Sequence, residues 1–325
     1  GAEGALMAAA RPTVSVVIPN WNGARLLPAC LDALAAQTHV PLEVILVDGA
    51  STDDSVALVR ARYPWVRLLE LPRNRGFAGN ANAGIRAARG AIIALLNNDA
   101  EAEPGWLAAL VTGFDAPDVG ACTSKILLYD CRDVLNAAGD VYYRDGTPGN
   151  RGAWEVDRGQ YDAEHEVFGA SGCACAYRRA MLEDVGLFDE RLWMYCEDVD
   201  LSFRAHLRGW RCRYVPTARV YHRLSATGGG PLASYYCGRN FVHVALRNLP
   251  APLLWRYAPR ILAAQARITL EALRHWRGAA ARARLRGQVA ALRELPAALA
   301  QRRAIQARRR ASAATIARLL TPGSR

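Results

Sequence analysis

Three acidic residues open a stretch of helical spacing in the second half of the chain. Glu197, Asp198 and Asp200 precede an amphipathic run that ends near Arg208. The helix dipole favours acidic side chains at a helix N-terminus, which accounts for two of the three without any catalytic role. The same position keeps a carboxylate ionised at neutral pH, as a general base requires. The trio is therefore a candidate source of a catalytic base.

Polar side chains also follow the apolar run 91–96. Asn97, Asn98 and Asp99 present two amides and one carboxylate, and such oxygen donors suit Mg²⁺ or Mn²⁺ bridging a diphosphate. His222 ends a later apolar run, and its imidazole could complete a metal site. The alternatives are an ordinary turn after a strand and a structural histidine.

Asp48 is a third polar position, at the end of the apolar run 42–47. Its carboxylate can accept a hydrogen bond from the imide N–H of uracil or thymine or from a ribose hydroxyl, or it can be a solvated carboxylate or a helix cap. The first apolar run leads into Pro-Asn-Trp-Asn-Gly at 19–23. This turn lacks the glycines of Gly-x-Gly-x-x-Gly, which disfavours a dinucleotide-dependent dehydrogenase.

The elements that position these residues alternate along the chain. Apolar runs at 14–18, 42–47, 66–70 and 91–96 predict strands, and helical spacing at 26–36, 51–63 and 79–89 predicts helices between them. This alternation indicates an α/β fold with a mainly parallel sheet covered on both faces. Ligands of such sheets bind beyond the carboxyl ends of the strands, where the polar residues above are located.

The later part of the chain is less regular. We expect a long loop or small hairpins over the site at 130–166, a strand at 168–177, helices at 179–185 and 197–208, and two short strands at 210–215 and 218–221. Pro250, Pro252 and Pro259 predict a boundary. The expected organisation is a disordered leader or expression remnant at 1–12, one domain at 13–249 and a basic helical tail at 250–325.

The net charge of +11 is concentrated in this tail, where 16 arginines accompany two glutamates. Arg260, Arg267 and Arg274 recur every seven residues, and another sector of the helix carries Ile261, Leu262, Ile268, Leu270, Leu273 and Trp276. Such a basic amphipathic helix can lie on an anionic membrane surface, or it can pack its apolar stripe on the rest of the chain or on a second subunit in a homodimer. No aromatic residue interrupts the arginine-rich stretch 302–310, so nucleic-acid binding is not expected.

Composition excludes several classes of protein. Hydrophobic residues make up 51% and charged residues 22%, as in a globular protein. No apolar run reaches the roughly 18 to 20 residues that span a bilayer. The eight cysteines include no Cys-x-x-Cys pair, which excludes zinc ribbons and fingers and favours reduced, buried thiols of a cytoplasmic protein.

Taken together, the motifs resemble the inverting glycosyltransferases of family 2, most of all their bacterial rhamnosyltransferase-like branch. The matching strings, in the family's order, are VSVVIPNWNG, VILVDGASTDDS, NRGFAGNANAGI, ALLNNDAEAEPGWL, GASGCACAYRR, GLFDERLWMYCEDVDLSFRAHLRGWRCRYVP and ARVYH. They cover Val14 to about Thr227. The resemblance implies a GT-A fold, a Rossmann-like nucleotide-diphospho-sugar transferase architecture, in the domain at 13–249.

The resemblance also implies roles for individual residues. Asp99 would bind the metal with His222, and Asp198, beside Glu197, would be the catalytic base. The nucleotide sugar would lie against Pro19, Asn22, Asp48, Ser51, Asn80, Asn82, Asn97 and Asn98, and the acceptor against Trp193 and Tyr195. Trp154, in the irregular segment, has an aromatic ring suited to an acceptor sugar, or it packs within the loop. Gly49 departs from the asparagine usual in relatives, and two asparagines replace the first part of the family's Asp-x-Asp motif.

The function implied is transfer of a sugar, L-rhamnose among the candidates, in cell-surface polysaccharide synthesis. The donor would be dTDP-rhamnose or a UDP-sugar with Mg²⁺ or Mn²⁺, and the acceptor a saccharide or a polyprenyl-linked saccharide. Such an enzyme would work in the cytoplasm or peripherally at the inner face of the cell membrane. The alternative is a catalytically silent protein that binds sugar nucleotides and recruits membrane or partners through its tail.

Overall fold

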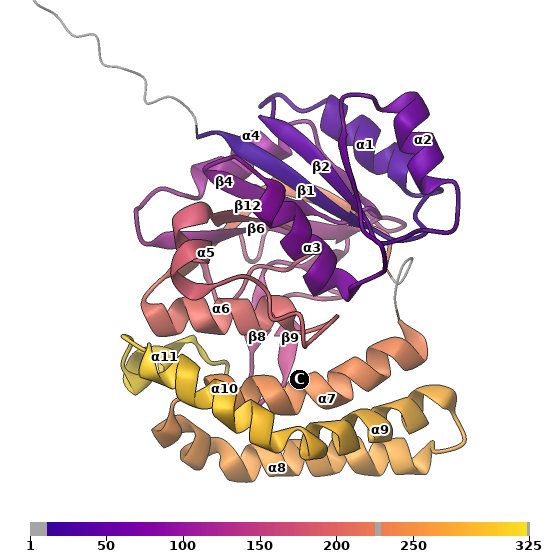
Figure 1. Ribbon diagram of the computed structural model, residues 1–325. Coiled ribbons are helices and arrows are strands. Elements are labelled where there is room, and N and C mark those ends of the chain that lie inside the picture. The colour runs from indigo at the N-terminus through magenta and orange to yellow at the C-terminus, as the bar shows by residue number, and fades with distance from the viewer. Residues whose placement is uncertain (1–11, 225–228, 324–325) are drawn as a thin grey trace, which may run out of the picture.

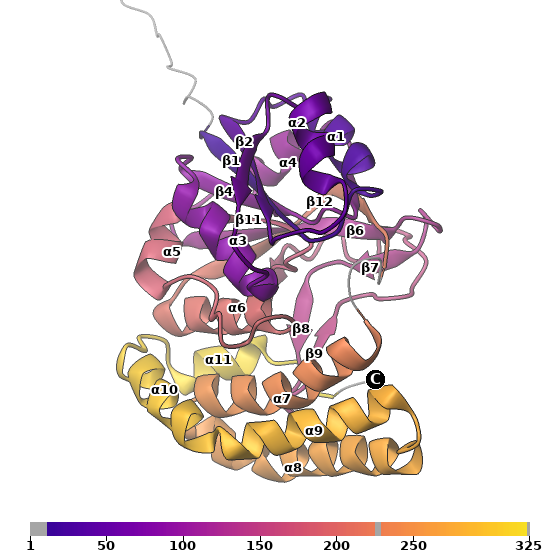
Figure 2. The ribbon, with the colours of Figure 1, turned by 45° about the vertical axis from the view of Figure 1, so that its right-hand side comes forward.

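The protein is described by a computed structural model covering residues 12–224 and 229–323 (Figures 1 and 2). The leader expected at 1–12 lies, apart from its last residue, outside the described residues.

A mostly parallel sheet forms the centre of the structure. Its order is β10 (Glu166–Val167), β12 (Arg211–His222), β6 (Val119–Leu128), β11 (Ala174–Arg178), β4 (Ile92–Leu96), β1 (Val14–Asn20), β2 (Glu43–Asp48) and β3 (Arg67–Glu70). β11 and β10 run antiparallel to their neighbours, and β1, β2, β3 and β4 pair in parallel as predicted. The register sets Asn20 opposite Asp48, so two polar side chains meet where β1 and β2 end.

Helices cover both faces of the sheet (Figure 2). Core residues of α1 (Leu27–Ala35), α2 (Ser55–Arg62) and α4 (Trp106–Thr112) pack in one apolar cluster with the sheet, and those of α3 (Gly76–Ala87), α5 (Arg179–Val185) and α6 (Glu197–Arg208) pack in a second. These continuous apolar strands are buried on both sides, which explains their lack of alternation. The three-layer arrangement predicted from the sequence is confirmed.

Two parts of the sheet differ from the prediction. The segments 210–215 and 218–221 form one strand, β12, whose register against β6 shifts between Val215 and Arg219. This irregularity accommodates Pro216, which has no N–H to donate to a ladder. The short strands β5 (Ala100–Ala102) and β7 (Leu135–Ala137) pair with β12 and β6, and β5 sets Ala100 opposite His222.

The irregular segment 130–166 contains a small hairpin, as expected, made of β8 (Asp140–Tyr142) and β9 (Pro148–Asn150). Lys125, the only lysine of the chain, lies fully buried beneath this segment. Its Nζ is 2.9 Å from Asp157 Oδ2 and 2.7 Å from Asp162 Oδ1. The buried ammonium therefore ties the loop to β6, because an unpaired charge there would be costly.

The tail is a set of helices lying along one side of the sheet domain (Figure 1). They are α7 (Gly230–Asn248), α8 (Ala251–Arg274), α9 (Ala279–Arg293), α10 (Leu295–Ala307) and α11 (Ala313–Leu319). The sequence prediction missed α7 entirely. It also placed a boundary at the prolines, yet Pro259 lies inside α8. Pro252 occupies the first turn, where a missing N–H is tolerated, and Pro259 removes one hydrogen bond without ending the helix.

The tail shares a core with the sheet domain. α6 contributes Val199, Phe203 and Leu207 to an apolar cluster that also contains Val244, Leu253 and Ile316 of the tail helices. Arg247 of α7, 1% exposed, donates to Asp200 of α6 and, over 2.5 Å, to Asp189. The helix that carries the acidic trio is thus held from both sides.

All eight cysteines are free thiols. Among the described residues, none of the helices has the length and apolar character that crossing a bilayer would require.

Candidate active site

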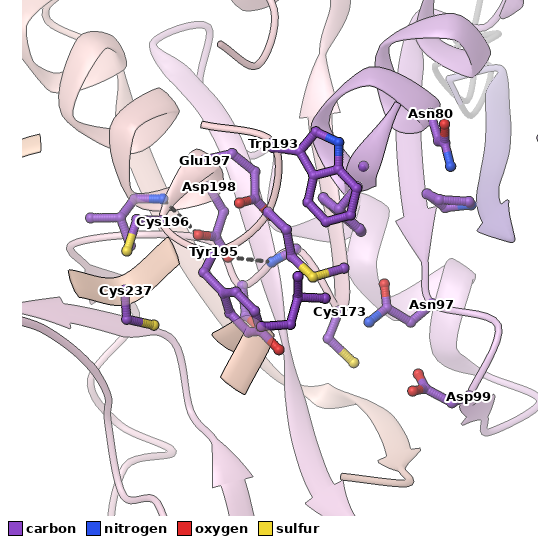
Figure 3. Close-up of a pocket in the computed structure, with 18 of the residues that line it drawn as sticks. Asn80, Asn97, Asp99, Cys173, Trp193, Tyr195, Cys196, Glu197, Asp198 and Cys237 are labelled. Atoms are coloured by element: carbon purple, nitrogen blue, oxygen red, sulfur yellow. Dashed lines mark hydrogen bonds between the residues drawn. The ribbon is translucent and has the colours of Figure 1, made fainter. Parts of the chain in front are cut away.

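A cavity of about 440 Å³ opens beyond the carboxyl ends of β1, β4 and β12 (Figure 3). Its walls come from distant parts of the chain, including the turn after β1, the start of α3, the loop after β4, the segment 193–199 and the first turns of α7. Figure 3 shows Asn97 and Asp99 on one side and Glu197 and Asp198 on the other. The polar side chains of 97–99 and of Glu197 and Asp198 therefore meet around one space.

Asn20 connects the end of β2 with the loop after β4. Its Nδ2 donates to Asp48 Oδ1 over 2.9 Å, and its Oδ1 accepts from Asn98 Nδ2 over 2.7 Å. Asp48 also accepts from the N–H and the hydroxyl of Ser51, at 2.9 and 2.6 Å. A Cβ at Gly23 would lie 2.2 Å from Asn20 Oδ1, so only glycine fits beside this buried network.

Asp99 and His222 lie side by side at the ends of β4 and β12. His222 Nε2 is 3.3 Å from Asp99 Oδ1, and His222 Nδ1 is 2.8 Å from Asn136 Oδ1. With the Asn136 amide oriented in this way, Nδ1 carries the hydrogen and Nε2 faces Asp99. This is the arrangement by which a second residue orients a histidine that binds metal.

These two side chains fit a divalent cation that also binds a diphosphate. The described residues contain no group of three or more His, Cys, Asp or Glu suited to a metal. Magnesium and manganese in sites of this kind take one or two protein carboxylates and complete their shell with phosphate oxygens and water. Burial lowers the pKa of His222, but Cys173 and Asp99 raise it to about 11, so a cation that binds both residues must displace a proton.

Asp198, in the first turn of α6, is the best-supported carboxylate on the opposite wall. Its Oδ2 accepts the N–H of Gly172 over 2.9 Å, and its Oδ1 accepts the N–H of Val199 over 2.8 Å. A Cβ at Gly172 would lie 3.4 Å from that Oδ2 and 3.2 Å from Phe77, so glycine allows the close approach of the backbone. Two fixed donors stabilise the ionised carboxylate.

Glu197 and Asp140 are also buried beside Asp198. Burial raises the pKa of Asp198, and the two backbone N–H groups oppose that rise. Burial, followed by the charge of Asp198, raises the pKa of Glu197 and of Asp140 well above the usual range. Within the described part of the chain, neither Glu197 Oε2 nor Asp140 Oδ2 has a hydrogen-bond partner. Asp198 is therefore the member of this group best able to carry negative charge.

Asp200, the third acid of the trio, has another role. Burial alone would raise its pKa, but Arg247 and Arg204 outweigh burial and lower the pKa to about 2. Its oxygens accept from Arg247, Arg204 and Asn248. Asp200 points into the contact with the tail, and it is not part of the cavity wall.

The segment before α6 has an unusual backbone. Trp193, Tyr195 and Cys196 have φ values of 64°, 65° and 67°. The ring of Trp193 stacks on Tyr236 of α7, with centroids 5.0 Å apart and an angle of 13°. Trp193 and Tyr195 also line the cavity, as does Asp198.

Not every predicted residue lines the cavity. The structure brings together Pro19, Asn80, Asn97, Asn98, Asp99, Trp193, Tyr195, Glu197, Asp198 and His222. Asn22, Asp48 and Ser51 are not among the residues that line the cavity, and they hydrogen-bond among themselves and with Thr52 and Asn20. Asn82 uses its amide to bind Phe188 and Glu190, and Trp154 lies 72% exposed on the loop surface.

Sequence reasoning missed Asn20, Asn136 and Asp140. Asn20 lay within a quoted motif, so its position at the end of β1 was a usable signal. Asn136 and Asp140 belong to the segment without periodicity, and pairing of β7 with β6 and the single bridge of Asp140 to Gly169 bring them to the site. No local sequence pattern predicts that either residue lies at the site.

Comparison with known proteins agrees with this geometry. The family model "Glycosyl transferase family 2" matches residues 15–186, more than half of the chain. The chain belongs to this family. This match confirms the expectation of a glycosyltransferase. The segment of the chain that the family model matches includes Asp48, Asp99 and Asp140.

Two curated relatives share 30% identity with this glycosyltransferase. One is the N-acetylglucosaminyl-diphospho-decaprenol L-rhamnosyltransferase of Mycobacterium tuberculosis, aligned over 269 residues, 74% of this chain and 87% of the relative. The other is the O-antigen biosynthesis protein RfbC of Myxococcus xanthus, aligned over 226 residues, 66% of this chain but 18% of the relative. The glycosyltransferase is thus of the rhamnosyltransferase-like branch.

The fold also resembles solved glycosyltransferases. A mannosyltransferase from Pyrobaculum calidifontis, in complex with GDP-Man and Mn²⁺, matches with a TM-score of 0.56 over 92% of this chain and 84% of its own, at 23% identity. The expected GT-A fold is confirmed by this likeness, together with the C-terminal helices.

Proposed function

We propose that the protein is an inverting glycosyltransferase that moves a sugar, L-rhamnose, from a nucleotide diphosphate to a saccharide or a lipid-linked saccharide in cell-surface polysaccharide synthesis. One observation carries the proposal: Asp198 and the pair of Asp99 and His222 line opposite parts of one cavity. The name of the mycobacterial relative supports L-rhamnose as the sugar and a diphospho-decaprenol as the acceptor carrier.

In the proposed reaction the acceptor hydroxyl attacks C1 of the donor sugar in line with the bond to the diphosphate. Asp198 takes the proton of that hydroxyl as the new C–O bond forms, and the nucleotide diphosphate leaves with the electron pair of the broken bond. Asp99 and His222 would hold a divalent cation, which when bound would supply Lewis-acid stabilisation of the leaving diphosphate. A single displacement inverts the configuration at C1.

The chain's own groups orient both substrates. Asn97 and Asn98 offer amide groups beside Asp99, where a diphosphate would lie, and Trp193 and Tyr195 offer rings to the acceptor sugar. The backbone donors at Gly172 and Val199 aim the Asp198 carboxylate into the same space. Positioning of this kind removes much of the entropic barrier to a reaction between two substrates.

The test compares Asp198→Asn with Glu183→Gln, an exposed carboxylate on α5 away from the cavity. Transfer from dTDP-L-rhamnose should fall by about 10³-fold or more in Asp198→Asn, with donor affinity retained, because only the base is lost. Glu183→Gln should match the native protein. Most of the activity remaining in Asp198→Asn would refute the base, and a product that keeps the donor's anomeric configuration would refute inversion.

A further inference from the structure

The side of α8 that faces away from the sheet carries a row of exposed apolar side chains. Trp255, Leu262, Leu270, Leu273 and, just after the helix, Trp276 are 78%, 69%, 55%, 49% and 58% exposed. We call these five residues the α8 stripe. Figures 1 and 2 both place α8 on the outer side of the tail, away from the central sheet. The stripe is thus available to a partner outside the described chain.

Helical geometry confirms that the stripe is one surface. At 3.6 residues per turn, Trp255, Leu262 and Leu273 lie within about 20° of one another around the helix, and the first and last are about 27 Å apart along it. Of the buried residues of α8, Leu253, Tyr257 and Ala264 lie about 160° to 180° from the line of Trp255 and Leu273, and Ala272 lies about 100° from it. Ile261 and Ile268, which the sequence pattern grouped with the stripe, are partly buried instead.

Arginines border the stripe on one side. Arg256, Arg260, Arg267 and Arg274 are exposed and lie about 100° to 140° from the line of Trp255 and Leu273. Glu271 is the single acid of α8, and its carboxylate lies 3.7 Å from Arg274 and 3.0 Å from His275. The face therefore combines an apolar line, a tryptophan at each end and an unbalanced positive border.

We propose that the α8 stripe docks flat on an anionic lipid bilayer, with its tryptophans and leucines at the level of the headgroups and its arginines on the lipid phosphates. Tryptophan is enriched at that level, and each basic residue near an anionic surface adds to the attraction. A two-fold dimer through the stripe would bring the arginines of both copies to one interface with only Glu271 from each copy to oppose them. Charge thus favours lipid over a second copy.

The proposal is independent of the transfer reaction, because its test measures binding only. The full chain is sedimented with vesicles of phosphatidylcholine and phosphatidylglycerol, and with vesicles of phosphatidylcholine alone. We expect at least about tenfold tighter binding to the anionic vesicles, weakening as salt is raised. Quenching of tryptophan fluorescence by brominated lipid should occur, and should diminish in Trp255→Ser/Trp276→Ser.

Matched variants identify the surface. Trp255→Ser/Leu262→Ser and Arg260→Gln/Arg274→Gln should each lose about tenfold in vesicle binding at unchanged thermal stability, because these side chains are exposed. The controls Val40→Ser/Trp65→Ser and Arg62→Gln/Arg73→Gln alter exposed side chains of the sheet domain and should bind as the native protein does.

Three results would overturn the proposal. The first is equal binding of the native chain to both kinds of vesicle. The second is native vesicle binding by Trp255→Ser/Leu262→Ser, which would show that the apolar side chains contribute nothing and that charge alone attracts the protein to lipid. The third is a native chain that ignores vesicles but is dimeric, with Trp255→Ser/Leu262→Ser monomeric, which would assign the stripe to a second copy.

Discussion

The side-chain amide of Asn240 donates a hydrogen bond to the backbone carbonyl of Tyr195 over 2.8 Å. The same Nδ2 lies 3.0 Å from the carbonyl of Leu192 and 3.1 Å from that of Met194. One buried amide of α7 therefore gathers three carbonyls of the segment that leads into Asp198. Positive φ values at non-glycine residues cost about 1 to 3 kcal/mol each, so this segment needs such outside support.

We expect Asn240→Ala to slow transfer by about ten- to a hundredfold, because the segment would relax and move Asp198 and the acceptor surface. Donor affinity should stay within about twofold, since the Asp99 side of the cavity does not touch Asn240. Steady-state kinetics and calorimetric titration with dTDP separate the two effects. Gln265→Ala, which removes an amide from α8, is the control, and equal loss in both variants would argue for general destabilisation.

The pH dependence of transfer should report Asp198. Since burial raises the pKa of this carboxyl, the base is protonated as pH falls through a value above the ordinary 3.8, and kcat/KM falls with it. Asp140→Asn should keep most of the activity at neutral pH, because burial already favours the neutral form of that side chain. A profile that stays level down to the ordinary aspartate range would contradict the assignment.

Metal binding should depend on Asp99. In Asp99→Ala, electron paramagnetic resonance of Mn²⁺ with dTDP present should show affinity lower by about tenfold or more, because a carboxylate ligand is lost. Asn136→Leu should have a smaller effect of the same sign, since it only releases the His222 ring. If the native protein bound dTDP equally with and without Mn²⁺, the proposed cation site would fail.

Stability should depend on the buried contact of Arg247 with Asp200. Asp200→Asn should lower the free energy of unfolding by about 3 kcal/mol, because it leaves the Arg247 charge buried without its main partner. Arg247→Met should cost a similar amount, and the double variant less than the sum. Urea unfolding measures all three. Arg60→Met, at an exposed pair with Glu70, should change little, and additive losses in the double variant would argue against coupling.

The same pair of Arg247 and Asp200 should make the stability of the fold decrease at low pH. The pKa of Asp200 is lowered to about 2, so its contribution is complete above the unfolded value near 3.8 and is lost as pH falls from there toward 2. By linkage this amounts to about 2 kcal/mol. Glu197 and Asp140 have the opposite effect on the pH dependence of stability. Their pKa values are raised in the folded protein, so folding is favoured at low pH, where both carboxyls are protonated.

The sequence predicted the parts of the fold with strong local patterns. The helix at 197–208 has the bounds of α6, because acidic residues begin it and Gly209, at φ 97°, ends it. The helix expected from 51 begins at Ser55, since Asp53 accepts from the N–H and hydroxyl of Ser55 in the preceding turn. Motifs at strand ends could be placed in one site because parallel strands end at one edge.

What the sequence could not supply came from long-range packing. α7 begins at Gly230, the last of three consecutive glycines in the sequence, and its residues divide between the cavity, α6 and α9, so no single apolar face marks it. The roles of Asn240 and Arg247 follow from partners more than 40 residues away. Which apolar side chains of α8 stay exposed likewise depends on which side of that helix the other tail helices cover.

The burial of Lys125 has a practical consequence. Reagents that acylate lysine find no accessible lysine side chain in the folded protein, because the chain's single ε-amine is enclosed with Asp157 and Asp162. The rate at which such a reagent labels Lys125 would instead measure how often the 130–166 segment opens and exposes the amine.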